Sequence, residues 1–485
     1  MRIFTYCEHH PDRTLAVTDD GSSILYREML ETGEMIRERA GHRLIFILCR
    51  NTPGTLLGYL GSLHAGAVPL LLDAEISPVL LEDLIRLYHP AFIVVPGTER
   101  EKAEAVSEKA GFPPVSAGEI RDSVLLRTDP DGGPELAPEL TLLLTTSGST
   151  GSQKLVRLTG ENLDANAESI AQYLRIDENE RPVTMLPMNY SYGMSVINSH
   201  LLKGAPIMLT DHAIMERGFW ERVIRDGVTS LVGVPYTYEI FRRLDLINMD
   251  LPALRTLTQA GGKLPTALHE AFASWALRTG RRFYVMYGQT EAAPRMGYLP
   301  AERALEKRGS MGIAIPGGKL MLMDEAGKEI TKPDIVGELV YEGPNVAMGY
   351  AVKPEDLALG DEWHGRLVTG DMAKKDEEGF FYITGRKKRF LKIMGKRLNL
   401  DEAERILGKE FPDTAFACVG NDRILCVYAE KEENVKEEEE PLADRWISYL
   451  EETTGISGRS VRVHFVKRIP RSDSGKIQYA KLVIE

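Results

Sequence analysis

The sequence predicts an α/β protein. We expect a large N-terminal domain with mixed and parallel α/β sheets plus a small β-rich subdomain, followed by a small α+β domain at the C-terminus. Four short, continuously apolar runs have the length and composition of buried strands: "RLIFILC" (43–49), "AFIVVP" (91–96), "APIMLT" (205–210) and "VTSLVGVP" (228–235). Helical patterns such as "SPVLLEDLIRLY" (77–88) and "TALHEAFASWALRTG" (266–280) separate them. Buried strands alternating with helices are typical of parallel sheets covered on both faces.

Length and composition restrict the class of protein. With 485 residues, 43% hydrophobic and 27% charged, the chain has the composition of a soluble globular protein of about two to four domains. A net charge of −12 argues against a nucleic-acid surface or an anionic-membrane anchor. The four cysteines show no C-x-x-C metal spacing, so reduced and mostly buried thiols are expected.

The pattern of apolar residues indicates a cytoplasmic protein without a membrane partner. The start, "MRIFTYCEHHPDR" (1–13), lacks an apolar core of signal-peptide length. The most apolar stretch, "TLLGYLGSLHAGAVPLLL" (55–72), is interrupted by His64, glycines and Pro69. It predicts a core helix that runs into a buried strand.

Changes of sequence texture suggest where the domains divide. Around residue 309 the apolar runs give way to short strands separated by Gly, Pro and Asp turns, which predicts a β-rich subdomain over 308–387 within a large domain of residues 1–387. A smaller charged α/β segment follows "GRKKR" (385–389), so we expect a C-terminal lid domain over 388–485.

"TTSGSTGSQKLV" (145–156) combines glycines, hydroxyls and a lysine, which suit a bound phosphate. It is not a P-loop of the G-x-x-x-x-G-K-[ST] type, because Gln153 precedes Lys154 and Leu155 follows it. "VMYGQTEAA" (285–293) ends a strand-like run with Glu291 beside Thr290, and a carboxylate of this kind can share Mg²⁺ with phosphates. Taken alone, that second stretch is equally a strand end with an exposed polar turn.

Two further stretches carry candidate polar groups. "RLVTGDMAKKDEEGFFYITGRKKR" (366–389) places Asp371 and Arg386 in glycine turns, where they can hydrogen-bond a sugar or phosphate or merely cap two hairpin turns. "RIPRSDSGKIQY" (468–479) places Lys476 on a turn near the C-terminus. The basic cluster "GRKKRFLKIMGKR" (385–397) can also be read as a nucleic-acid patch, but the negative net charge disfavours this.

Together and in this order, the four stretches resemble the acyl-adenylate-forming superfamily of acyl- and aryl-CoA synthetases, stand-alone adenylation enzymes and luciferases. The resemblance extends from "SILYREML" (23–30) to Lys476 and includes "AGAVPLLLD" (65–73), "GGKLP" (261–265) and "GELVYEGPNVAMGY" (337–350). It implies an AMP-forming acid–thiol ligase, which uses ATP to convert a carboxylic acid to an acyl-AMP and then transfers the acyl group to a thiol. The first stretch departs from the family pattern at Gln153 and Leu155, where Pro and Gly are usual.

The resemblance also implies roles for individual residues. Lys476, Thr290 and Glu291 would be catalytic: Lys476 would bridge the acid and the α-phosphate, Thr290 would contact that phosphate, and Glu291 would hold Mg²⁺. The other ATP-binding residues would be Thr146, Ser147, Gly148, Ser149, Thr150, Gly151 and Lys154 for the β- and γ-phosphates, Gly261, Gly262, Lys263, Tyr287 and Gly288 for adenine, and Asp371 with Arg386 for ribose.

Family members rotate the small domain between the two half-reactions, and the matching hinge here is Lys388. After rotation, the loop "KIMGKRLN" (392–399), with Gly395 and Arg397, would line the channel for the phosphopantetheine arm of the thiol. A residue without a side chain leaves room for that arm at Gly395.

The acid pocket would include Tyr190 and Gly193, in "LPMNYSYGMS" (186–195). Amino-acid-activating members have an aspartate where this chain has Tyr190, so an α-amino acid is disfavoured because its ammonium would be buried without a counter-charge. The acceptor is CoA or a separate acyl carrier protein. A catalytically silent nucleotide- or acyl-binding relative and a P-loop kinase or NTPase are the alternatives in other functional classes.

Overall fold

The structure is a computed structural model that describes residues 1–129, 132–145, 154–393, 396–421, 423–431, 439–454, 456–471 and 477–484. The chain forms two compact units. The first comprises the described residues up to Leu320 together with Tyr341–Leu367, and the second comprises Met321–Val340 and the described residues from Val368 onward. The predicted division at residues 387 and 388 lies inside the second unit. Because packing alone does not locate a hinge, Lys388 as the hinge stays a prediction.

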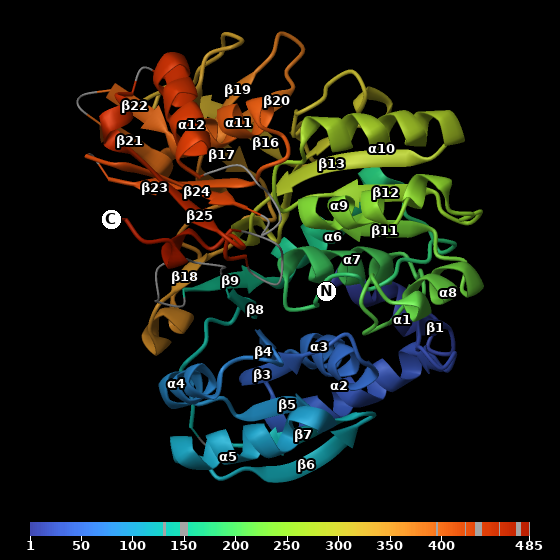
Figure 1. The fold of residues 1–485 in the computed structure, drawn as a ribbon. Helices are drawn as coiled ribbons and strands as arrows, with labels where there is room; N and C mark the ends of the chain where they lie inside the picture. Colours follow the sequence, from blue (N-terminus) through green and yellow to red (C-terminus); the bar gives the residue numbers. More distant parts are fainter. Residues whose placement is uncertain are drawn as a thin grey trace. The chain divides into compact units, whose positions relative to one another are not determined.

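An eight-stranded sheet forms the base of the first unit (Figure 1). Its order is β18 (Gly349–Ala351), β9 (Leu155–Thr159), β8 (Leu140–Thr145), β4 (Val68–Asp73), β3 (Leu44–Cys49), β5 (Phe92–Pro96), β7 (Ser123–Arg127) and β6 (Val115–Ile120). The four central strands, from β8 to β5, run parallel. The strands predicted at 43–49 and 91–96 are therefore confirmed as β3 and β5.

Helices bury both faces of this sheet. Ile45 and Ile47 share a core with α2 (Tyr26–Ala40) and α3 (Pro53–Ala65). Phe46, on the opposite face of β3, shares another core with α4 (Pro78–Tyr88) and α5 (Arg100–Ala110). Every residue of β3 is buried, which explains why its sequence is continuously apolar and not alternating. The stretch 55–72 forms most of α3 and β4, as predicted.

A second, five-stranded sheet lies in the same unit and positions the site. Its order is β11 (Ser230–Gly233), β12 (Thr256–Gln259), β13 (Arg282–Gly288), β14 (Arg295–Leu299) and β15 (Ile313–Ala314), with β11 to β13 parallel. Phe283 of β13 packs among aromatic rings of α9 (Pro235–Arg243) and α10 (Thr266–Thr279). On the other face, Tyr173 of α6 (Gly160–Leu174) contacts Met286 of β13, and Tyr192 of α7 (Ser191–Leu202) contacts Thr258 of β12.

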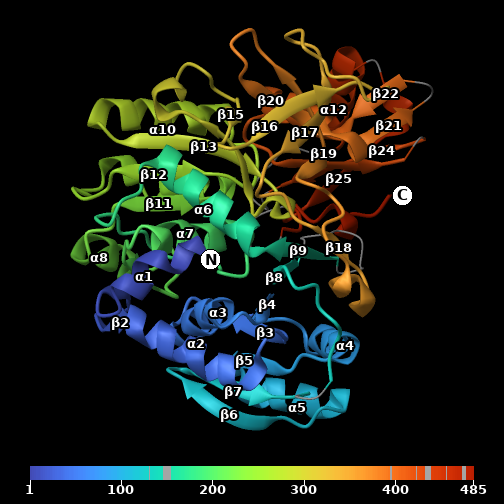
Figure 2. The same cartoon turned by 180° about the vertical axis from the view of Figure 1, so that it is seen from behind.

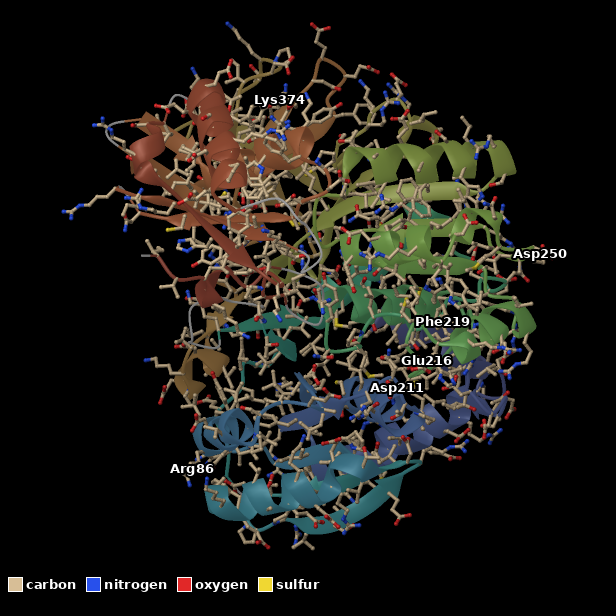
Figure 3. All side chains as sticks on the ribbon, in the orientation of Figure 1. Arg86, Asp211, Glu216, Phe219, Asp250 and Lys374 are labelled. Atoms are coloured by element: carbon tan, nitrogen blue, oxygen red, sulfur yellow. The ribbon has the colours of Figure 1, made fainter. Side chains whose placement is uncertain are left out.

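A small sheet completes this unit, with the order β10 (Ile207–Met208), β1 (Thr14–Val17) and β2 (Ser23–Leu25), beside α1 (Thr5–His9) and α8 (Arg217–Arg225). Figure 2 shows the same elements from behind. Phe219, Arg222 and Val223 form the buried face of α8, whereas Glu216 at its N-cap is exposed. Figure 3 labels Phe219 and Glu216.

The second unit is α+β. Its four-stranded sheet has the order β16 (Lys319–Met323), β17 (Gly337–Glu342), β19 (Arg366–Lys375) and β20 (Phe381–Arg386), in which β19 and β20 are antiparallel. A hairpin, β21 (Phe390–Ile393) and β22 (Lys396–Asn399), follows. The three-stranded sheet β23 (Phe416–Gly420), β24 (Leu425–Glu430) and β25 (Val461–Val466) is packed with α11 (Leu400–Glu410) and α12 (Glu439–Thr454).

Short 3₁₀ helices connect these elements at Arg2–Phe4, Gly97–Glu99, Leu246–Asn248, Thr290–Ala292, Ala301–Arg303, Pro354–Ala358, Lys387–Arg389, Gly458–Ser460 and Tyr479–Lys481. All four cysteines are buried and none of them takes part in a disulfide, as expected for reduced thiols. Within the described ranges, no helix has both the length and the apolarity needed to cross a bilayer. The alternation of strands and helices, with a separate α+β unit, confirms the predicted fold class.

Candidate active site

The predicted phosphate-binding stretch connects β8 and β9, but Thr146 to Gly151 lie outside the described residues. Lys154 is described and exposed. Its ammonium lies 5.3 Å from the centroid of the Tyr350 ring. The Tyr350 hydroxyl in turn donates a hydrogen bond of 2.7 Å to Glu291 Oε1. Burial, together with the Glu291 carboxylate, raises the pKa of Tyr350, so this hydroxyl stays a donor at neutral pH. Tyr350 therefore connects the predicted phosphate lysine with the predicted metal-binding carboxylate.

Glu291 and Thr290 lie in a 3₁₀ turn directly after β13. The Glu291 carbonyl accepts a hydrogen bond from the Ala347 backbone, which attaches this turn to the segment before β18. Thr290 Oγ1 lies 3.2 Å from Ser191 Oγ, at the first turn of α7. The predicted catalytic pair is thus held between two segments that are distant in sequence.

The predicted adenine residues lie at the carboxyl ends of two neighbouring parallel strands. Gly261, Gly262 and Lys263 follow β12, and Tyr287 with Gly288 ends β13, with Gln259 in register with Val285. The Gln259 side chain donates to the Gly262 carbonyl at 2.8 Å and fixes the glycine turn. Ligands of open α/β sheets bind at such strand ends.

Tyr190 is the N-cap of α7 and is largely buried. Burial raises its pKa to about 12. Its hydroxyl lies only 2.6 Å from the position that a Cβ at Gly261 would take, and Gly261 has a φ of +82°. Both the space and the backbone conformation at that position therefore require glycine.

Gly193 has a packing role. A Cβ there would lie 2.3 Å from the Pro187 carbonyl oxygen, so glycine lets α7 approach the preceding turn closely. Its predicted contact with the acid stays a prediction. In the first unit the structure thus brings together Lys154, Glu291, Thr290, Ser191, Tyr190 and Gly261 through the contacts described above.

The predicted ribose residues belong to the second unit. Asp371 of β19 and Arg386 of β20 are paired in register, with Arg386 Nε 3.6 Å from Asp371 Oδ1. Asp371 is buried, whereas the Arg386 side chain is exposed. The structure thus brings this predicted pair together in one hairpin.

The residues predicted for the moving parts are mostly outside the described part of the chain. Lys476 and Gly395 are not described, and only the backbone is described at Lys388 and Arg397. Next to the predicted hinge, Arg389 binds Asp401 and Glu404, each at 2.6 Å, and its guanidinium lies 3.6 Å from the centroid of the Tyr479 ring. The contact between Arg389 and Tyr479 attaches the segment that begins at Tyr479, three residues after Lys476, to the segment next to the predicted hinge.

Sequence reasoning missed Tyr350, Ser191, Arg389 and Arg295. Tyr350 is the last residue of the stretch 337–350, which supports the resemblance but carries no predicted role. Ser191 directly follows the predicted Tyr190. Arg295 is a charged residue in the otherwise apolar strand β14, which was the one available signal for it. A charged residue in a strand usually faces solvent, so burial of Arg295 was not predictable from the pattern.

The donor set near Glu291 fits a hard cation. Among the described residues, no three His, Cys, Asp or Glu side chains gather into a metal cluster. A single carboxylate suits Mg²⁺, which commonly takes one or two protein carboxylates and fills its other positions with water and substrate phosphates. The exposed Lys154 nearby suits the same phosphates.

Comparisons with known proteins identify the family to which this chain belongs. Feruloyl-CoA synthase of Amycolatopsis is 28% identical over 95% of this chain and 94% of its own. Long-chain-fatty-acid–CoA ligase of Bacillus subtilis is 26% identical over 82% of this chain and 78% of its own. The structure of O-succinylbenzoate CoA synthetase from Bacillus subtilis with its acyl-adenylate intermediate has a TM-score of 0.79 at 20% identity, covering 99% of this chain and 97% of that one. Residues 3–351 match the family described as AMP-binding enzyme, and the chain therefore belongs to that family, as predicted.

Proposed function

We propose that this protein is an AMP-forming acid–thiol ligase that activates a carboxylic acid with ATP and passes the acyl group to CoA. The observation that carries the proposal is the connection of Lys154 to Glu291 through Tyr350, with Thr290 adjacent. The enzyme class agrees with the family and with relatives named as CoA ligases and CoA synthases. These names favour CoA as the acceptor, and a separate acyl carrier protein is the alternative.

In the first half-reaction, an oxygen of the acid's carboxylate attacks the α-phosphorus, the bond to the β-phosphate oxygen breaks, and pyrophosphate leaves. Lys154 would neutralise the phosphates, and Thr290 would donate to the attacked one. Glu291, oriented by Tyr350, would hold Mg²⁺, which supplies charge neutralisation on the phosphates. In the second half-reaction, the thiolate attacks the acyl carbonyl carbon and AMP leaves.

The deciding experiment measures pyrophosphate and AMP formation with ATP, Mg²⁺ and a panel of carboxylic acids, with and without CoA. The proposal requires pyrophosphate release that depends on an added acid, and a thioester once CoA is present. A catalytically silent relative releases no pyrophosphate with any acid. An NTPase releases phosphate without an acid, and an amino-acid-adenylating enzyme responds only to the α-amino acids of the panel.

Two variants separate the half-reactions. Lys476→Ala should lower adenylation by on the order of 100-fold or more while thioester formation from supplied acyl-AMP continues, because a charge at the attacked phosphate is lost. Gly395→Leu should block the thiol arm while acid-dependent pyrophosphate release continues. Equal loss of both half-reactions in both variants would contradict the two-conformation assignment.

A further inference from the structure

Three arginines are buried in the described part of the chain, and one of them lacks an acidic partner. Arg157 pairs with Glu362, and Arg222 pairs with Asp19 and Asp226. Arg295, only 2% exposed, has no carboxylate within ion-pair distance among the described residues. A buried charge without a counter-charge is costly, so an arginine retained in this state suggests an anionic ligand.

The contacts of Arg295 leave its charge unbalanced. Its Nη2 donates to Ser195 Oγ at 3.1 Å, and its guanidinium carbon lies 4.1 Å from the centroid of the Tyr192 ring. Its Nη1 contacts the Met286 sulfur. Its Nε is buried, and no described residue accepts a hydrogen bond from it. All of these partners are neutral groups.

The tyrosines around Arg295 do not supply the missing negative charge. Burial raises the pKa of Tyr190 to about 12 even though Arg295 acts to lower it. Burial also raises the pKa of Tyr192 and of Tyr173, each against the same opposing effect of Arg295. These hydroxyls are therefore neutral at physiological pH, and Arg295 retains a full uncompensated charge.

Arg295 borders a cavity between α6, α7 and the five-stranded sheet, with both polar and apolar walls. Its other lining residues include Val196, Ser199, His200, Val232 and Thr256. Ser230 Oγ and Thr256 Oγ1, which also border it, are buried, and within the described part of the chain neither has a hydrogen-bond partner. The one carboxylate in the wall, Glu180, is bound by Arg282 and by the Thr229 hydroxyl. Unused donors therefore face this cavity together with the unpaired cation.

Helix α7 relates Arg295 to the reacting end of the site. Ser191 on its first turn contacts Thr290, and Ser195, four residues later, contacts Arg295. Four residues of α-helix correspond to a rise of about 6 Å. A spacer of a few carbon atoms, or one ring, between two acidic groups spans such a distance.

We propose that Arg295 binds a second acidic group on the substrate, so that the acid activated by this protein is a dicarboxylate. One carboxylate lies beside Thr290 and is adenylated, and the other accepts hydrogen bonds from the Arg295 guanidinium. Ser195, whose hydroxyl donates to the Tyr192 carbonyl and accepts from Arg295 Nη2, positions that guanidinium. The inference rests on the proposed function for the identity of the reaction. Binding of a dicarboxylate at Arg295 can be measured without that reaction.

The test uses pairs of acids with equal carbon skeletons: butyrate and succinate, hexanoate and adipate, 4-methylbenzoate and terephthalate, plus monomethyl adipate, in which the second acidic group is a neutral ester. In acid-dependent pyrophosphate release, the best diacid should exceed its monoacid and its half-ester by about 100-fold or more in kcat/KM, because a monoacid leaves the guanidinium unpaired. Thermal unfolding with diacid alone, without ATP, should show a rise in Tm that the monoacid does not give.

Arg295→Met should remove the diacid's Tm rise and most of its kcat/KM advantage over the monoacid. Arg295→Lys should retain part of the preference, and Ser195→Ala should lower the diacid's kcat/KM by about 10-fold for one lost hydrogen bond to a charged group. Arg281→Met is the matched control, because Arg281 stacks on Trp275 outside the site.

Equal use of both members of each pair, or equal losses on both in Arg295→Met, would overturn the proposal while leaving the ligase function intact. A Tm rise given equally by chloride or inorganic phosphate, with no preference for diacids, would also overturn it and assign Arg295 to a structural anion. If no acid releases pyrophosphate but diacids still raise Tm through Arg295, the ligase function fails and the binding site stands.

Discussion

Arg222 and Arg295 are buried to nearly the same extent, 3% and 2% exposed, but their surroundings differ. Arg222 on α8 binds Asp19 and Asp226 and donates to the Val17 and Leu209 carbonyls. Arg295 on β14 has only neutral partners. Burial therefore does not distinguish a structural arginine from a functional one. The net charge around the guanidinium distinguishes the two. At Arg222 the fold supplies the negative charges, whereas at Arg295 a ligand must supply them.

The largest expected effect is on Arg222. Arg222→Met should lower the free energy of unfolding by about 3–5 kcal/mol, because it removes one of the two arginines that bind Asp226 and leaves two buried carbonyls without their donor. Burial raises the pKa of Asp226, but the hydrogen bonds and charges of Arg225 and Arg222 outweigh it and hold that pKa below its ordinary value. Urea denaturation of the wild type and the variant measures the loss.

The same change at Arg295 is the matched comparison. Arg295→Met should change the free energy of unfolding by less than about 1 kcal/mol or raise it, since it removes a charge that has no counter-charge. A loss at Arg295 as large as that at Arg222 would show that the two arginines play the same structural part.

The sequence indicates the strand ends and glycine turns of this site better than it indicates the buried contacts between distant residues. The family motifs placed Tyr190, Thr290 and Glu291, because strand ends and glycine turns are local features that a short stretch of sequence encodes. Tyr350 contacts Glu291, which is 59 positions away in the sequence. Arg295 contacts Ser195, which is 100 positions away. No periodicity in a single sequence reports such contacts. Burial of a charged strand residue follows only from the packing of α6 and α7 on the sheet.

The next effect concerns His200, which lines the same cavity as Arg295. Burial lowers the pKa of His200 to about 4, so His200 is neutral and adds no second cation there. Because the folded-state pKa is below the unfolded value of about 6.5, the unfolded state takes up the proton first. Its contribution to stability is therefore complete above pH 6.5 and is lost as the pH falls toward 4, by about 3 kcal/mol in total.

His200→Asn removes this proton uptake, and its amide can still donate to the Val196 carbonyl that now lies 2.8 Å from His200 Nδ1. The stability of the variant, followed by urea denaturation from pH 7 to pH 4, should fall less than that of the wild type. The exposed His10→Asn is the control. Identical pH profiles for His200→Asn and the wild type would mean that folding does not change the proton affinity of His200.

Arg157 provides an intermediate case. It is fully buried, but its partner Glu362 is half exposed, and the remaining contacts are to the Leu359 and Gly360 carbonyls. When Arg157→Met removes the guanidinium, Glu362 can turn into water, and the carbonyls remain unsatisfied. We expect a loss of about 2 kcal/mol in the free energy of unfolding, smaller than at Arg222. A loss of unfolding free energy greater than that of Arg222→Met would contradict the view that the loss depends on whether a carboxylate stays buried when its arginine is removed.

The last prediction concerns the coupling between Arg295 and the ring of Tyr192, which lies against its guanidinium. Tyr192 contacts the guanidinium with its face and Thr258 with its hydroxyl, so two variants separate these contacts. Tyr192→Phe keeps the face and removes the hydroxyl, and Tyr192→Leu removes both. In a double-mutant cycle with Arg295→Met, the coupling energy should be about 0.5–2 kcal/mol for Tyr192→Leu and close to zero for Tyr192→Phe. If instead the ring contact couples the two residues by as much as a buried ion pair does, Tyr192 would satisfy the arginine by itself. The need for an anionic ligand, and with it the contrast between Arg222 and Arg295, would then disappear.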